Sequence, residues 1–267
     1  EEGESVPILM ANGGAAYPFE AITAMYSLPD YRGVDPTKYL SLFYAMFFGI
    51  MLSDAGYGIV IAAACFIVLR KFALEGMTYK MIKMFFYCGL SAVFWGALFG
   101  GWFGDFFQVA AEVIFGKKIT IEPLWFNPID DPTRLLIWSL VFGVVHIFFG
   151  MGIKAVMLIR RGQWKDAVFD VFSWYMIIGG AAMWLAGGSI GQAVVKAGMY
   201  IAIAGAVILL LTGGRNNKGI GKVTGGLSSL YNITSYISDI LSYSRLLALG
   251  LATGVIATVV NTMGSLA

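Results

Sequence analysis

The chain has 267 residues, of which 58% are hydrophobic and only 13% are charged, and its mean hydropathy is +0.77. Since about a quarter of the residues in a soluble domain are charged, this composition excludes a soluble globular protein and indicates an integral membrane protein. The formal net charge is only +2, and no basic run is interleaved with aromatic residues, which argues against a nucleic-acid partner.

Apolar runs alternate with short charged loops from Tyr39 onward, after a polar segment over 1–38 that contains four prolines. The prolines predict a connector with short helical turns. Strand-like alternation is absent from the runs, so helices are the spanning architecture that satisfies the backbone in lipid. We therefore predict an all-α, polytopic transmembrane helical bundle of about seven segments over 39–267. Its apolar runs cover 39–69, 82–104, 134–159, 168–188, 193–212 and 229–263.

The first run, 39–69, has an awkward length. As one helix its 31 residues would be roughly 46 Å long, whereas folded in two it gives arms of only about 22 Å, against about 30 Å of hydrocarbon. The stretch "MLSDAGYGIV" places Ser53, Asp54 and two glycines at the midpoint, which favours a break. We predict a short helical hairpin with arms over 39–52 and 57–70. One long tilted helix, with the connector outside, is the alternative.

The distribution of lysine and arginine predicts the orientation of the bundle. Basic residues follow the first, third and fifth runs, whereas the loop over 105–133 holds five acidic residues and two lysines. The loop around 189–196 holds only Lys196. By the positive-inside rule the three basic loops face the cytoplasm, and the loops over 105–133 and around 189–196 face outside. The basic residues are Arg70, Lys71, Lys80, Lys83, Arg160, Arg161, Lys165, Arg215, Lys218 and Lys222.

The last run carries Arg245 in the middle of "SDILSYSRLLALGLATGVIA". At about 35 residues, or roughly 52 Å, this helix must tilt strongly or project from the bilayer. An arginine at the bilayer centre costs roughly 2.5–3.5 kcal/mol on insertion scales, so its presence needs a reason. Helical spacing gives Arg245 a face of mostly small and polar residues, against which another helix could pack closely. That face consists of Ser238, Ser242, Arg245, Ala248, Leu249 and Ala252.

These residues carry a resemblance to a known family. The stretch "LSYSRLLALGLA" resembles the arginine-bearing helix of the membrane subunit of rotary V-type ATPases, called subunit a in eukaryotes and subunit I in prokaryotes. "PFEAITAMYSLPDYRGVDPT" is similar to that family's connector into the membrane, and "FFGIMLSDAGYG" to its first hairpin motif. "GALFGGWFGDFF" and "FGVVHIFFG" are similar to its next two spanning helices. The resemblance covers nearly the whole chain, and the compact 105–133 loop is closer to the bacterial or archaeal form.

The resemblance implies a multi-pass protein of the cell (plasma) membrane, the stator subunit of a motor that couples translocation of H+ or Na+ to rotation. It implies a rotor ring of proteolipid (c/K) subunits as partner, and peripheral stalk subunits that bind through a large cytoplasmic N-terminal domain. In the family that domain precedes the position of Glu1, and a final helix with a second arginine follows the position of Ala267. Seven of eight membrane segments are therefore expected in this chain.

In this family the arginine faces ring carboxylates, which implies that Arg245 separates two aqueous half-channels and makes each passing carboxyl release its ion. The alternative is that Arg245 pairs with a carboxylate of its own chain, such as Asp54, to hold the bundle together. Ser238, Asp239 and Ser242 are candidates for lining the cytoplasmic half-channel, although Asp239 also fits a carboxylate solvated at the membrane edge.

Two further polar residues lie in the apolar runs. Asp54 is either a channel-facing acid or a turn residue that caps the second arm of the hairpin. His146, the only histidine, is either a proton-path residue or a hydrogen-bonded core histidine. One histidine cannot form a metal site without several further ligands, so we expect neither a metal nor a cofactor.

The sequence contains no GxxxxGK[ST] loop, so ATP hydrolysis is expected in another subunit and this chain is not expected to be an enzyme by itself. Two other functions stay open. A secondary ion transporter would need internal repeats, which are not apparent, and ion flux through the isolated protein would favour it. A passive membrane anchor of a peripheral complex would be favoured by normal pumping after Arg245 is changed to alanine.

Overall fold

Helices are the regular secondary structure of the described residues in the computed structural model, and none of these residues lies in a strand. Five helices in the described ranges are long and apolar enough to cross a membrane, which confirms the predicted all-α polytopic bundle. Lys218, predicted in the third basic loop, lies outside these ranges. The structure describes residues 9–26, 28–29, 33–189, 191–213, 215 and 221–266.

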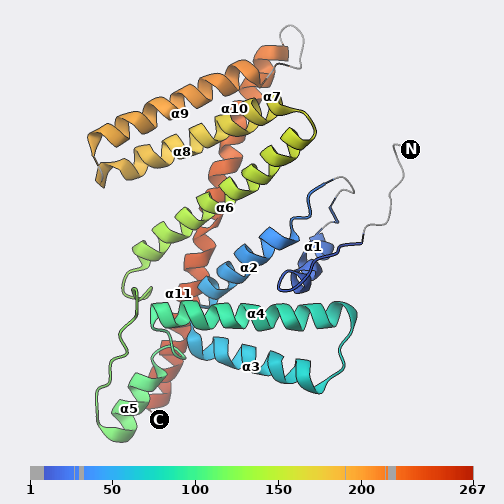
Figure 1. The fold of residues 1–267 in the computed structure, drawn as a ribbon. Coiled ribbons are helices and arrows are strands. Elements are labelled where there is room, and N and C mark those ends of the chain that lie inside the picture. Colours follow the sequence, from blue (N-terminus) through green and yellow to red (C-terminus); the bar gives the residue numbers. More distant parts are fainter. Residues whose placement is uncertain are drawn as a thin grey trace. The chain divides into compact units, whose positions relative to one another are not determined.

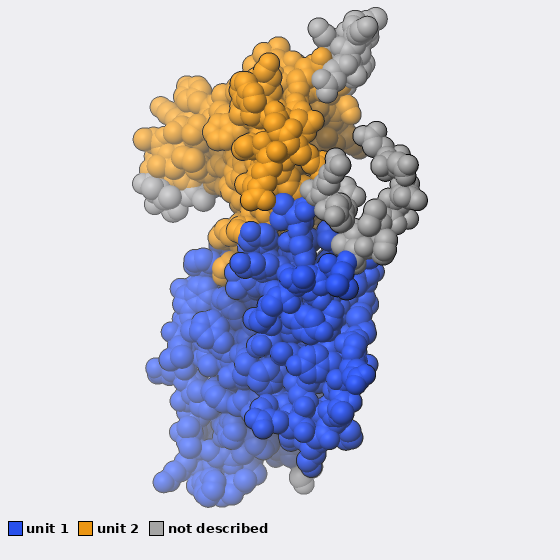
Figure 2. Space-filling model, turned by 45° about the vertical axis from the view of Figure 1, so that its right-hand side comes forward, with its two compact units in different colours: residues 1–139, 244–267 blue, residues 140–243 orange. Residues whose placement is uncertain are grey.

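Two compact units make up the chain: unit 1 is residues 1–139 with 244–267, and unit 2 is residues 140–243 (Figure 2). In unit 1 helices α2, α3 and α4 pack together, with α3 and α4 side by side, and α11 contacts both α2 and α5 (Figure 1). The elements of unit 1 are η1 (Tyr17–Phe19), α1 (Glu20–Tyr26), α2 (Thr37–Leu52), α3 (Ala55–Lys71), α4 (Gly76–Phe99), α5 (Phe106–Phe115), the start of α6 (Pro132–Arg160) and α11 (Ser244–Ser265).

The break predicted inside the first apolar run is present between α2 and α3. Ser53 ends α2 in the left-handed conformation, with φ of 51°, and its N–H still bonds the Gly49 carbonyl. Asp54 then caps α3, because its carboxylate accepts the backbone N–H of Tyr57 at 3.0 Å. The chain therefore turns within two residues.

Glycines allow α3 and α4 to approach each other at backbone distance. A Cβ atom built on Gly96 of α4 would lie 2.0 Å from the backbone nitrogen of Ala55. A Cβ atom built on Gly58 of α3 would lie 2.6 Å from the backbone nitrogen of Val93. Small residues of this kind are the usual means of close helix packing in lipid, where van der Waals contact replaces the hydrophobic effect.

The described part of the connector packs on the N-terminal part of α4. The charge pattern predicts that this end of α4 faces the cytoplasm. Glu20, only 1% exposed, accepts hydrogen bonds from Lys80 Nζ at 2.6 Å and from the Asn12 backbone N–H at 2.9 Å. Burial by itself would raise the pKa of the Glu20 carboxyl, but these hydrogen bonds outweigh it and hold that pKa below its ordinary value. The apolar contacts beneath are made by Phe19, Ile22, Met84 and Cys88.

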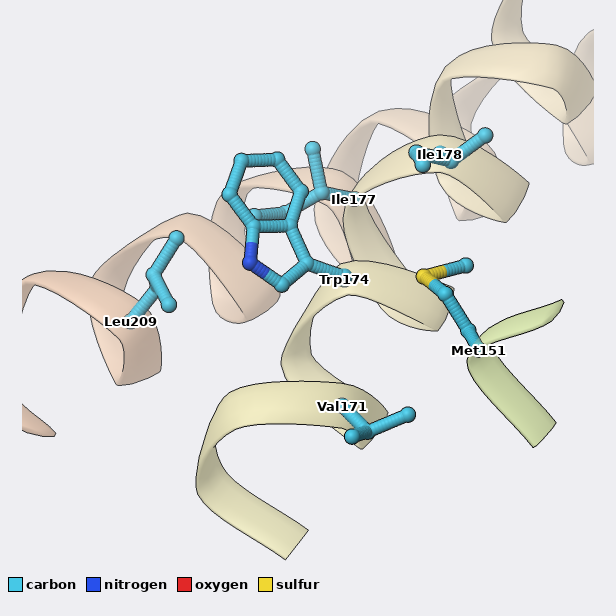
Figure 3. Packing of buried hydrophobic residues seen from close by; sticks show 6 residues of the cluster. All are labelled: Met151, Val171, Trp174, Ile177, Ile178 and Leu209. Carbon is cyan, nitrogen blue, oxygen red and sulfur yellow. The ribbon is translucent and has the colours of Figure 1, made fainter. Parts of the chain in front are cut away.

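Unit 2 is built around a layer of apolar side chains between α8, α9 and α6 (Figure 3). A Cβ atom built on Gly198 would lie 2.7 Å from the Gly180 carbonyl oxygen, so α8 and α9 pack as closely as α3 and α4 do. The buried residues of this core are Met151, Val171, Trp174, Ile177, Ile178 and Leu209. The elements of unit 2 are the rest of α6, α7 (Trp164–Asp166), the π-helical segment η2 (Ala167–Phe172), α8 (Ser173–Ala186), η3 (Gly187–Ser189), α9 (Gln192–Thr212) and α10 (Gly221–Ser242).

An arginine clamp ties the end of α9 to the start of the preceding helix. Arg215 donates to both carboxylate oxygens of Asp170, at 2.8 and 2.7 Å, and to Asp166 at 2.5 Å. These contacts, with the hydrogen bond to Asp170 the strongest, raise the pKa of the Arg215 guanidinium. The basic loop after the fifth run is thereby neutralised in part by its own chain.

We predict that Gly96→Ala lowers the free energy of unfolding by about 1–3 kcal/mol, because the added methyl group must displace the backbone of α3. Gly150→Ala is the matched control: Gly150 is also helical, but a Cβ atom there would have no neighbour within 4 Å. The control variant should be neutral or slightly more stable. Denaturant titration of both variants in detergent micelles measures the difference, and equal losses would contradict the close packing.

Candidate functional site

Arg245 lies in the first turn of α11, and it is exposed. None of the ion pairs or hydrogen bonds found among the described residues involves its guanidinium. The helical stretch around it, Ser228–Ser265, is 38 residues long and apolar enough to span a membrane. Within that stretch α10 ends at Ser242 and α11 begins at Ser244, so a local interruption lies two residues before the arginine.

Both carboxylate oxygens of Asp54 accept hydrogen bonds from the backbone. Only 2% of the residue is exposed, and its Oδ1 accepts the backbone N–H groups of Tyr57 and Phe103, both at 3.0 Å. Its Oδ2 accepts the backbone N–H of Gly104 at 2.7 Å. Asp54 therefore caps α3 and fixes the loop after α4, and it makes no ion pair with Arg245. This geometry gives no support to the alternative in which the two residues hold the bundle together.

A cavity of about 210 Å³ with a mixed polar and apolar lining, here called the unit-1 cavity, lies beside Asp54. Glycines of α11 form part of its wall: a Cβ atom on Gly250 would lie 2.9 Å from Ser53 Oγ, and one on Gly254 would lie 3.0 Å from the Ile129 side chain. A side chain at either position would therefore displace the opposite wall of the cavity. Its polar side chains come from Ser53, Asp54, Asp105, Gln108, Asn127 and Thr258.

A second polar cavity, here called the unit-2 cavity, has a volume of about 490 Å³ and includes Asp239. Ser238 and Ser242 do not line it. Ser238 is exposed, and the Ser242 hydroxyl donates to the Asp239 carbonyl at 2.6 Å. The structure thus associates one of the three predicted α10 residues with a polar space. The polar side chains of this cavity come from Lys154, Asp170, Ser229, Asn232, Ser235, Tyr236 and Asp239.

His146 is joined to Tyr243, the residue at the interruption between α10 and α11. The distance between His146 Nδ1 and the Tyr243 hydroxyl oxygen is 2.6 Å, and the two rings meet edge to face. The Tyr243 ring lies over Gly143, where a Cβ atom would come within 2.5 Å of it. Tyr243 is not among the residues that the sequence singled out. The signal was its phenol hydroxyl in an apolar run, since such a group in lipid needs a partner.

The arrangement supplies a fixed charge and two polar spaces in a set order along the chain. The α10 residues of the unit-2 cavity precede Arg245, and the α11 residues of the unit-1 cavity follow it. No group of three or more histidine, cysteine or acidic side chains that could hold a metal gathers in the described ranges. Chemically, the site offers places for water and ions, and one cation that no neighbouring carboxylate in the described structure neutralises.

These features define a polytopic α-helical membrane protein with a charged residue in a spanning segment. The chain is 34% identical, over 98% of its length, to the A-type ATP synthase subunit I of Thermococcus kodakarensis, and 30% identical, over its whole length, to that of Methanocaldococcus jannaschii. It is 23% identical, over 98% of its length, to the V-type ATP synthase subunit I of Chlamydia pneumoniae. The chain belongs to the subunit I family of A-type and V-type ATP synthases, which confirms the resemblance.

The chain spans 39%, 41% and 47% of the lengths of these three relatives. No family model matches it.

We predict that Asp54→Asn lowers the free energy of unfolding by about 1–3 kcal/mol, because an amide NH₂ group cannot accept the Gly104 N–H that Oδ2 accepts. Asp130→Asn is the control, since Asp130 is exposed and lies in the segment between α5 and α6. Thermal unfolding of the two variants in the same detergent makes the comparison. A stability of Asp54→Asn equal to that of the control would show that the carboxylate does not hold the loop.

Proposed function

We propose that this chain is the ion-conducting stator of the membrane motor of a rotary A/V-type ATP synthase, with Arg245 facing the carboxylates of a rotating ring of proteolipid subunits. The observation that carries the proposal is the guanidinium of Arg245, which is exposed in an apolar spanning helix without an ion-pair partner in the described structure. The family membership of the chain supports the same assignment.

The electrostatics of such an encounter account for ion release. A ring carboxyl in hydrocarbon stays protonated, or holds Na+, because the bare anion is poorly solvated there. Beside Arg245 the charged form becomes favourable: a pair about 4 Å apart at an effective dielectric constant of about 20 gains about 4 kcal/mol. That energy equals a fall of roughly three units in the pKa of the carboxyl, enough to release a proton into an adjacent aqueous space. Further rotation carries the carboxylate away to be reloaded.

An arginine suits this position better than a lysine. The guanidinium stays protonated when it is desolvated, whereas a buried lysine shifts its pKa and becomes neutral. A permanent charge also repels cations that would otherwise pass directly between the two aqueous spaces. The barrier matters, because one elementary charge that leaks across about 100 mV loses about 2.3 kcal/mol of stored energy.

The two cavities are the proposed half-channels. The unit-2 cavity contains Asp170 and Lys154, close to the basic loops predicted in the cytoplasm, and Asp239 would accept ions on that side. The unit-1 cavity is lined by residues of the acidic loop predicted outside, such as Asp105 and Asn127. Asp54 contributes a wall there and holds the loop, while water and the other polar side chains would carry the ion.

On this proposal the chain binds no ATP. Peripheral stalk subunits and the nucleotide-binding head would complete the machine, which would work in the plasma membrane with H+ or Na+. Either ion fits the mechanism, because the loaded ring carboxyl is neutral in both cases.

We predict that Arg245→Lys and Arg245→Ala each abolish ATP-driven ion pumping in reconstituted vesicles while the complex still assembles. Assembly should survive because no described contact depends on this guanidinium. Arg161→Lys is the matched control, an exposed arginine in a predicted cytoplasmic loop, and it should pump normally. Pumping at the normal rate by Arg245→Ala would refute the proposal, and would favour a passive anchor.

We also predict that Ser235→Cys, in a chain whose Cys65 and Cys88 are replaced by alanine, reacts with a membrane-impermeant thiol reagent added from the cytoplasmic side, and that the reaction slows pumping. Ser235 lines the unit-2 cavity, where water would solvate the reactive thiolate form of the cysteine. Ile237→Cys is the control on the same helix: Ile237 is 50% exposed but lines neither the unit-1 nor the unit-2 cavity, so lipid should protect it. Equal reaction at both positions would exclude a water-filled half-channel here.

A further inference from the structure

Helix α5 (Phe106–Phe115) carries an apolar face that no described part of the chain covers. Phe106 and Phe107 are each 47% exposed, Val113 is 62% exposed and Ile114 is 70% exposed. With Ala110 they follow the i, i+3, i+4 and i+7 spacing of one helical face, about 120° wide. Ala111, on another side of the helix, is buried, and Gln108 lines the unit-1 cavity. One side of α5 therefore packs on the protein, and a different, apolar side is exposed.

The position of α5 in unit 1 places this face beside spanning helices. α5 begins seven residues after Phe99, the last residue of the spanning helix α4, and it packs against α11, part of another spanning stretch. The contact is fixed by Asn261 of α11, whose side-chain amide donates to the Asp105 carboxylate and to the Phe103 carbonyl, each at 2.8 Å. An apolar face held at the end of two helices that span the membrane would border the bilayer surface.

The charges next to the face fit lipid headgroups. Lys117 and Lys118 follow α5 after its capping residue Gly116, and both are exposed. Lys118 makes only a loose contact of 3.6 Å with Glu112. Ammonium groups at the end of an apolar helix can reach lipid phosphates while the apolar side chains lie among the acyl chains. Trp102, a residue type enriched at membrane interfaces, lies four residues before α5.

We propose that α5 is an interfacial helix, which inserts Phe106, Phe107, Val113 and Ile114 into the outer leaflet and directs Lys117 and Lys118 to phospholipid phosphates. The lipid contact would hold the loop that forms one wall of the unit-1 cavity. The proposal rests on the exposed face and its charges, and it stands whether or not the chain conducts ions.

Spin labels at two positions of α5 test this inference in the full-length protein reconstituted into phospholipid nanodiscs, with Cys65 and Cys88 replaced by alanine. Ile114→Cys places the label on the apolar face, and Glu112→Cys places it about 160° away around the same helix. Oxygen, which concentrates among acyl chains, should relax the Ile114 label several-fold more effectively than a water-soluble nickel chelate does. The order should be reversed for the Glu112 label.

Preferential relaxation of the Ile114 label by the nickel chelate would overturn the proposal, because the face would then lie in water. Poor access of both reagents would also overturn it, because the face would then be covered by protein, either another segment or a partner. A second measurement keeps the native cysteines: a photoreactive benzophenone amino acid at Phe107. Its crosslinks should be to phospholipid, and crosslinks to a polypeptide would reject lipid as the occupant.

Discussion

One constraint governs this structure: a polar group in the hydrocarbon layer has no water to bond and must find its partner in the protein. The backbone meets the constraint by forming helices. Hydroxyl groups meet it by donating to carbonyls four residues earlier, as Ser139, Ser173 and Thr253 do. Among the described residues no buried side-chain nitrogen or oxygen is left without a hydrogen-bond partner. Any polar group that departs from this pattern therefore needs a functional explanation.

Asp54 and Arg245 differ in whether the described protein supplies hydrogen-bond partners for their charged groups. The Asp54 carboxylate is surrounded by three backbone N–H groups, so its charge is stabilised by dipoles and needs no cation nearby. Arg245, in the same unit, is exposed and has no such partners in the described structure. Its five donors must be satisfied by water, by lipid or by protein outside the described residues. This requirement, more than the rarity of arginine in membranes, motivates the proposal that a mobile carboxylate meets it.

Sequence patterns predicted the features that interactions between neighbouring residues determine, namely the helices and one turn. The apolar runs predicted the spanning helices. The turn residues around Ser53 and Asp54 predicted the break between α2 and α3, because capping acts within one helical turn. Helix α5 was not predicted, because the 105–133 segment was interpreted as a loop from its charges. The spacing of its apolar residues nevertheless indicates a helix. The contact of His146 with Tyr243 joins residues 97 positions apart, and no single-sequence pattern encodes such a pair. The proposed role of Arg245 came from the family resemblance, not from spacing.

The two cavities show two ways to make polar space beside a membrane helix. On α10 the polar lining is supplied by side chains such as Asn232 and Asp239, whereas α11 lines its cavity with Gly250 and Gly254, which lie close to Ser53 and Ile129. Arg245 separates these two sets along the chain. A cation that comes within about 4 Å of its guanidinium meets a repulsion of about 4 kcal/mol at an effective dielectric constant of about 20, roughly a thousandfold reduction in occupancy. A free cation would thus be excluded from the vicinity of this residue, whereas an anion on a moving partner would be attracted to it.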